Sequence, residues 1–135
     1  MKEAAIRDAA FQPLWELAFL LGTDACIDVF IRSVWRIVPD PEDCEFVREP
    51  ELQIRQFLQT GFLEGDCDDA ATLAGSMCYA IGMPCALVAI RTPENAEFSH
   101  VFLRTGNGLD IDPIVPADQL PIPVERIAEV MIFPL

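Results

Sequence analysis

The feature that most constrains this sequence is a long stretch without charge, from Ala70 to Ile90. It is close in length to the roughly 20 residues that a bilayer-spanning helix needs. Gly82 and Pro84 interrupt the stretch, and both residue types are typical of a break between two elements. A buried helix followed by a buried strand therefore explains it, and we expect it to form the centre of the hydrophobic core rather than a membrane span.

The hydrophobic pattern changes at Gly82. Before it, apolar residues recur at intervals of three and four, which predicts helices at residues 4–21, 24–35, 50–59 and 67–81. After it, short apolar or β-branched runs predict strands at residues 85–90, 97–104, 109–112 and 128–133. Helices followed by antiparallel strands predict an α+β fold. We expect one domain over residues 1–135, with a helical part of about 1–82 and a sheet part of about 83–135.

Charge argues against several classes of partner. The chain carries 22 acidic and 9 basic side chains, and its formal net charge is -13. Such a balance repels phosphate backbones and anionic lipid head groups. We therefore expect neither nucleic acid nor a membrane as partner, and a basic or neutral partner instead. A peptide or protein substrate is expected from the candidate cysteine site described below.

Cysteine and histidine usage argues against a metal. Five cysteines form no CxxC pair, and with a single histidine they do not complete a usual tetrahedral zinc set. We predict neither a metal site nor a cofactor. The N-terminal residues include Glu3, Asp8 and Glu16, which does not fit a secretory signal. We therefore expect a cytoplasmic location with reduced thiols.

Cys67 is the candidate nucleophile. It lies in Gly65-Asp66-Cys67-Asp68-Asp69, where a glycine turn leads into the predicted helix 67–81. The unpaired amides and positive dipole end of the first helical turn favour a thiolate and can stabilise an oxyanion. The neighbouring acids oppose ionisation of the thiol by like-charge repulsion. A cationic histidine partner is therefore needed.

His100, the single histidine of the chain, lies in an alternating run that predicts a strand, Phe98-Ser99-His100-Val101-Phe102. The sequence Gly106-Asn107-Gly108 predicts a three-residue hairpin loop in which Thr105 pairs with Leu109. Histidine on such a strand is held on a rigid element, where it can serve a nucleophile as base and acid.

The hairpin register selects the acid that orients the histidine. Counting outward pairs Arg104 with Asp110 and Phe102 with Asp112, so His100 and Asp112 share a face as diagonal neighbours at about 7–8 Å. A loop one residue longer or shorter would place the histidine and both acids on opposite faces. The triad therefore depends on this turn: Cys67 attacks, His100 moves the proton and Asp112 orients the imidazole.

Other polar residues receive lesser roles. We expect Asp66, Asp68, Asp69 and Ser99 to line the site. Asp110 is predicted to be a solvated charge. Cys78 and Cys85 lie in apolar stretches and are predicted to be core residues.

These motifs together resemble the transglutaminase-like superfamily. The resemblance rests on the GDCDD box around Cys67, on Ala80-Ile81-Gly82-Met83-Pro84, on Phe98-Ser99-His100-Val101 and on Ile111-Asp112-Pro113, and it covers about residues 54–116. It implies a papain-like core, in which the cysteine lies on a central helix that packs on an antiparallel sheet bearing the histidine and aspartate. Val38-Pro39-Asp40-Pro41 is similar to a segment upstream of the box in small bacterial and phage members. Ile37 departs from the aromatic residue that often occurs there, and no side chain matches the family's second oxyanion donor.

Two hypotheses follow from the motifs and the resemblance. The first is a cysteine-dependent acyl-transfer enzyme, a peptidase or amidase rather than a cross-linking transglutaminase. The second is a phage virion or assembly protein that keeps the fold with little or no activity. It would have other virion proteins as partners and would lie in the host cytoplasm or in the virion.

Overall fold

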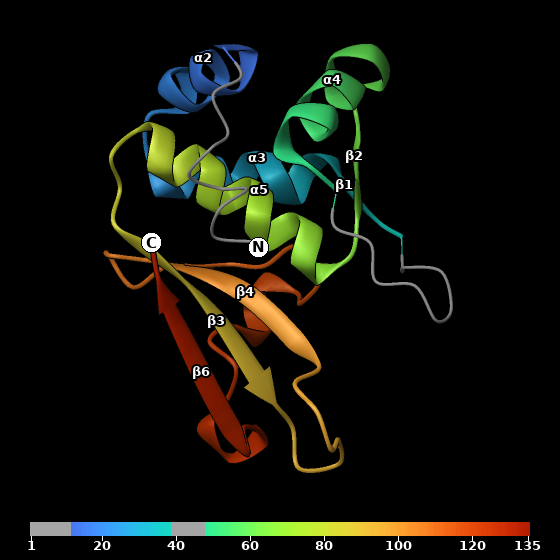
Figure 1. Cartoon of the computed structure of the whole chain (residues 1–135), viewed down its shortest axis with the longest axis vertical. Helices are drawn as coiled ribbons and strands as arrows, with labels where there is room; N and C mark the ends of the chain where they lie inside the picture. Colours follow the sequence, from blue (N-terminus) through green and yellow to red (C-terminus); the bar gives the residue numbers. More distant parts are fainter. Residues whose placement is uncertain (1–11, 39–47) are drawn as a thin grey trace.

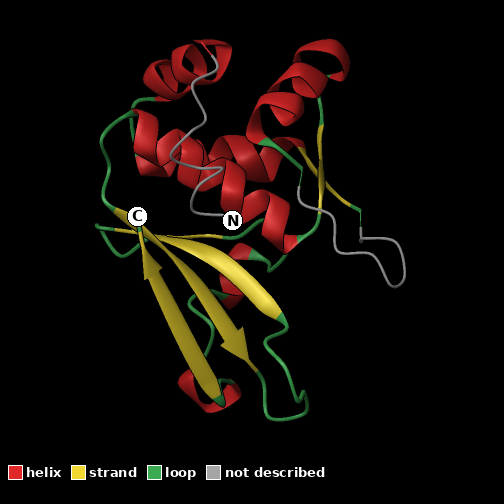
Figure 2. Ribbon diagram, viewed as in Figure 1, coloured by secondary structure: helices red, strands yellow, loops and turns green. Residues whose placement is uncertain are grey.

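The α-helices and the large antiparallel sheet occupy separate parts of the molecule (Figures 1 and 2). The computed structural model describes residues 12–38 and 48–135. Its helices are α2 (Gln12–Leu21), α3 (Asp24–Val34), α4 (Pro50–Thr60) and α5 (Cys67–Ala80). Strands β3 (Cys85–Arg91), β4 (His100–Thr105), β5 (Asp110–Ile111) and β6 (Glu129–Pro134) form an antiparallel sheet in the order β5-β4-β3-β6. This is the α+β organisation that the sequence predicts.

Two predicted features fall outside the part of the chain that the structure describes. The predicted start of the first helix, at residues 4–11, and the Pro39-Asp40-Pro41 segment lie outside the described residues. Among the residues that are described, no helix is long and apolar enough to cross a membrane.

Helix α5 lies at the boundary between the helical and sheet parts and contacts both (Figure 1). It packs on α2, α3 and α4 on one side and on β3 and β4 on the other. Every residue from Asp69 to Cys78 is buried. The uncharged stretch therefore forms the core, as predicted, because its helix and its strand cover each other.

Local backbone chemistry sets both ends of α5. At the start, the Asp66 carboxylate accepts hydrogen bonds from the amides of Asp68 and Asp69, and the Asp69 carboxylate accepts one from the Asp66 amide. This reciprocal arrangement is a capping box. At the end, Gly82 has φ +72°, and the Met83 amide donates to the Cys78 carbonyl at 2.9 Å. A left-handed glycine terminates the helix, as the sequence predicts.

The β4–β5 hairpin has the predicted register. Arg104 pairs with Asp110, and the Thr105 amide donates to the Leu109 carbonyl at 2.9 Å. Gly108 takes φ +83° and closes the loop, a conformation that glycine adopts without steric cost. Strand β4 begins at residue 100 rather than 97, because residues 93–99 form an exposed loop.

A two-stranded parallel pair was not predicted. Strand β1 (Trp35–Ile37) pairs with β2 (Leu63–Gly65), although residue 35 was expected to be helical and residues 62–66 to be a link. The indole of Trp35 and the amide of Val38 both donate to the Gly65 carbonyl, at 3.2 and 2.9 Å. This pair fixes the backbone two residues before Cys67, and its three-residue strands are too short to show a periodicity.

The sheet buries apolar residues on both faces. Leu87, Val101 and Leu103 belong to the main core under α5. Val88, Ile90 and Phe102 alternate with them, so they point to the opposite face. There they form a second cluster that is covered by Ile122 and Ile127 from the segment between β5 and β6. That segment contains two short 3-10 helices, η1 (Ala117–Gln119) and η2 (Val124–Arg126).

Candidate active site

Three elements bring the predicted triad residues together. Cys67 is the first residue of α5, His100 is the first residue of β4, and Asp112 directly follows β5. Helix α5 packs on β4, and β4 pairs with β5. The three residues are distant in sequence and become neighbours through this packing.

The imidazole of His100 is hydrogen-bonded to the buried carboxylate of Asp112. Nε2 of His100 contacts Oδ2 of Asp112, whose side chain is only 1% exposed. The other oxygen, Oδ1, accepts the amides of Ile114 and Val115 at 3.1 and 3.3 Å. The chain therefore turns around the carboxylate directly after Asp112 and holds it in one orientation.

The Cys67 side chain lies near the same imidazole and contributes to its pKa. Because Nε2 contacts Asp112, the nitrogen that remains for Cys67 is Nδ1. Burial lowers the pKa of His100, but the hydrogen bond with Asp112 and the nearby Cys67 side chain outweigh it and raise this pKa to about 10. The histidine is therefore an imidazolium at neutral pH, between a carboxylate and a thiol.

The imidazolium of His100 counteracts the negative charge that the sequence places around Cys67. Acids at positions 64, 66, 68 and 69 surround the start of α5, and they disfavour a negative sulfur. The positive charge of His100 beside Cys67 offsets this repulsion, as does the helix end. A cysteine beside an imidazolium that a buried carboxylate orients is the arrangement that nucleophilic catalysis by cysteine uses.

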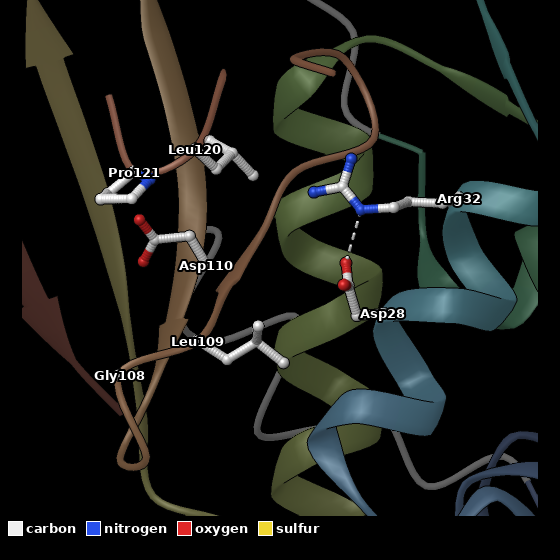
Figure 3. Close-up of a pocket in the computed structure, with 7 residues that line it drawn as sticks. All are labelled: Asp28, Arg32, Gly108, Leu109, Asp110, Leu120 and Pro121. Atoms are coloured by element: carbon white, nitrogen blue, oxygen red, sulfur yellow. Dashed lines mark hydrogen bonds and ion pairs between the residues drawn. The ribbon is translucent and has the colours of Figure 1, made fainter. Parts of the chain in front are cut away.

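Helix α3 supports the segment that follows Asp112. Nη1 of Arg32 donates to the Val115 carbonyl at 3.0 Å, and its Nε donates to Asp28 at 2.9 Å. Figure 3 shows these two α3 side chains facing the segment that carries Leu120 and Pro121, across a pocket of about 240 Å³. Burial raises the pKa of Asp28, the Arg32 guanidinium opposes this shift, and the charge of Asp112 adds to it. Arg32 therefore supports the backbone of Val115, whose amide in turn binds the Asp112 carboxylate.

The predicted lining residues differ in their surroundings. Asp66 and Asp68 are half-buried at the helix start, and Ser99 is exposed beside His100. Asp69 is fully buried, and both of its oxygens accept hydrogen bonds from Arg48, at 2.7 Å from the amide and 2.9 Å from the guanidinium. Its carboxylate is therefore engaged in fixing the start of α5.

Asp110 is not the solvated charge that the sequence predicts. It is buried, and its carboxylate accepts two hydrogen bonds from the Arg104 guanidinium, at 2.8 and 3.1 Å. The two residues are paired across β4 and β5, so the register that places Asp112 also places this ion pair.

A cavity beside His100 had no signal in the sequence. It measures about 520 Å³, and it is bordered by His100 together with the end of β3 and the segment between β5 and β6. This volume lies within the range of about 300–1,000 Å³ that is usual for ligand pockets. Over residues 12–38 and 48–135, no group of three or more His, Cys, Asp or Glu side chains is arranged to hold a metal ion.

Comparison with solved structures finds a likeness to the crystal structure of a "putative protease" from Parabacteroides distasonis ATCC 8503. The TM-score is 0.62 at 16% sequence identity, and the alignment covers 81% of this chain and 24% of that chain. The chain therefore spans about a quarter of the length of the structure it matches. At this identity the likeness concerns the fold alone. No family model matches the sequence, and no curated protein matches it.

Proposed function

We propose that this protein is a cysteine-dependent amide hydrolase, a peptidase or amidase with a papain-like core of the transglutaminase-like type. The observation that carries the proposal is the position of the His100 imidazole, which is hydrogen-bonded to the buried Asp112 carboxylate and lies near the Cys67 side chain at the start of α5. Cys67 is the nucleophile, His100 is the general acid and base, and Asp112 orients the ring.

The first half of the reaction uses the ion pair of Cys67 and His100. The thiolate attacks the carbonyl carbon of the amide, and negative charge develops on the carbonyl oxygen. The Asp66 carboxylate caps the amides of Asp68 and Asp69 but not that of Cys67. The Cys67 amide at the helix start therefore serves as an oxyanion donor. The C–N bond then breaks, the His100 imidazolium gives its proton to the leaving amine, and a thioester with Cys67 remains.

The second half regenerates the enzyme. The neutral imidazole of His100 takes a proton from a water molecule, and the hydroxide attacks the thioester carbon. The C–S bond breaks, so that a carboxylic acid leaves and the thiolate–imidazolium pair is restored. Cys67 and His100 are only partly buried, so water reaches them and is the acyl acceptor that favours hydrolysis over cross-linking.

The test is peptide cleavage by purified protein and by Cys67→Ala. Products from a defined peptide mixture are identified by mass spectrometry, and transfer of a fluorescent primary amine to the peptides is measured in parallel. We expect Cys67-dependent cleavage that exceeds amine transfer. Cys26→Ala is the matched control, because Cys26 is an exposed cysteine on a different helix, and it should retain full activity.

Two results would contradict the proposal. Cleavage that survives in Cys67→Ala would come from another residue or a contaminant. A folded wild-type protein that neither cleaves nor transfers would instead favour a catalytically silent assembly protein, whose partners would then be sought by co-purification with particles.

A further inference from the structure

We infer that the cavity beside His100 selects the residue on the amine side of the scissile bond, and that it takes a large apolar side chain there. This inference rests on the proposed hydrolase function and names its substrate class. The substrates would be peptides in which a residue such as Leu, Ile or Phe follows the bond that is cut.

The floor of the cavity is apolar. Ile90 is only 2% exposed, and Val115, Ile122 and Pro123 are half-buried. Ile90 is the β3 partner of His100, so the floor begins directly at the imidazole. An apolar side chain that enters this space leaves water for a surface that is already apolar, which is favourable without any further hydrogen bond.

The position of the cavity assigns it to the amine side. All of its lining residues lie between positions 90 and 126, and none comes from α5, the helix that carries Cys67. During cleavage the acyl group is bonded to Cys67, whereas the leaving amine must lie against His100 to receive its proton. A cavity that borders His100 and not Cys67 therefore lies beside the leaving amine and the side chain attached to it.

The charge of the protein disfavours acidic side chains in this cavity. Glu94, Glu125 and Arg126 are exposed residues that border the opening. Together with the His100 imidazolium these residues carry two negative and two positive charges, whereas the whole chain carries -13. The field of the whole molecule therefore repels acidic side chains, and the apolar floor accepts large neutral ones.

Binding is tested first, because it does not require turnover. The probes are phenylalaninamide and glycinamide, two amine products with the same charge, titrated into Cys67→Ala protein and followed by backbone-amide NMR. We expect phenylalaninamide to bind at least about 10-fold more tightly, with the largest shifts at Ile90, Val115 and Ile122. Equal affinities, or shifts centred elsewhere, would overturn the inference.

A matched pair of variants locates the site. Gln119 is exposed at the rim of the cavity, whereas Asp118 precedes it on η1, is also exposed and does not line the cavity. We expect Gln119→Trp to fill the cavity and weaken phenylalaninamide binding about 10-fold, and Asp118→Trp to leave it unchanged. An unchanged affinity in Gln119→Trp would contradict the inference, and denaturant unfolding checks that both variants are folded.

Cleavage by the wild type then separates this inference from the proposed function. Two peptides that differ only in Phe or Gly after the scissile bond should differ at least about 10-fold in kcat/KM. The ratio should fall toward one in Gln119→Trp. Cleavage that depends on Cys67 but ignores this residue overturns the cavity assignment and keeps the hydrolase. Selective binding without any cleavage overturns the hydrolase instead.

Discussion

Helix α5 carries two cysteines whose surroundings are opposite. Cys67 is half-buried at the first residue of the helix and lies against the imidazolium of His100. Cys78 is fully buried three turns later, and its thiol interacts with that of Cys85. The hydrogen bond with Cys85 raises the pKa of Cys78, and burial raises it further. The same side chain therefore lies beside a cation at one end of the helix and is kept as a neutral thiol at the other.

The comparison teaches that position along the helix decides the chemistry. The N-terminal end carries a partial positive charge, leaves the Cys67 amide outside the capping box, and lies beside His100. The C-terminal end presents carbonyl groups and apolar neighbours, which disfavour an anion. The predictions below test how much of the difference comes from the partner residues and how much from the helix ends.

The largest expected effect is on thiol reactivity. Iodoacetamide at pH 7 should alkylate Cys67 at least about 100-fold faster than Cys78, because only the first thiol is accessible and beside a cation. Mass spectrometry of peptides from a time course gives both rates in one sample. In denaturant the two rates should converge. Similar alkylation rates of Cys67 and Cys78 in the folded protein would show that the two ends of α5 do not differ in their effect on a thiol.

The next effect concerns His100, whose NMR signal is unambiguous because the chain has one histidine. Its pKa is raised to about 10 in the wild type. Asp112→Asn removes the anionic hydrogen-bond acceptor, so we expect the pKa to fall toward the ordinary value of 6.5. At pH 8 the imidazole then loses its charge, and Cys67 alkylation should slow by about 10-fold while Cys78 is unaffected. A pKa that does not move in Asp112→Asn contradicts the assignment of this partner.

The same shift gives stability a pH dependence of known sign. A group whose folded pKa lies above its unfolded value stabilises the fold fully below the unfolded pKa. Its contribution is lost as pH rises through the folded pKa. The stability advantage of wild type over Asp112→Asn should therefore be largest below pH 6.5 and decline toward pH 10, by an amount on the order of a few kcal/mol. Urea unfolding of both proteins at pH 6, 8 and 10 measures it.

The sequence predicted the parts that depend on local patterns. The three-residue loop at 106–108 determines the hairpin register, and the register places Asp112 on the face of His100. The glycine at 82 ends α5 for the same kind of local reason. The catalytic roles of the three residues remain predictions.

The features that were missed depend on long-range contacts. Strands β1 and β2 are three residues each and pair although the whole of α4 separates them in the sequence. Arg48 is 21 positions from Asp69, and nothing in the spacing of charges pairs them. The cavity beside His100 requires the segment between β5 and β6 to fold over the second face of the sheet. Such contacts leave no periodic signal in the sequence.

A smaller effect tests the polar network at the start of α5. Asp69→Asn removes the charge that pairs with Arg48 while keeping the shape of the side chain. Because Asp69 is fully buried, we expect a loss of about 3 kcal/mol in the free energy of unfolding. Glu51→Gln is the control, since it breaks an exposed ion pair with Arg55 and should cost about 0.5 kcal/mol or less. Equal costs would show that the Arg48 pair contributes no more than a surface contact.

The smallest expected effect on stability comes from replacing a glycine at one end of α5, and it is compared with the same change at the other end. Gly82 has φ +72° and open space where a Cβ would lie, so Gly82→Ala costs only the left-handed conformation, about 1 kcal/mol. Gly65 has φ +151°, and a Cβ there would lie 2.7 Å from the Cβ of Asp69, so Gly65→Ala should cost more and disturb the capping box. Urea unfolding gives both losses, and iodoacetamide gives the reactivity of Cys67. We expect Gly82→Ala to leave that reactivity unchanged and Gly65→Ala to reduce it. If Gly82→Ala also slowed the alkylation of Cys67, the two ends of α5 would be coupled, and position along the helix would no longer account for the difference between its cysteines.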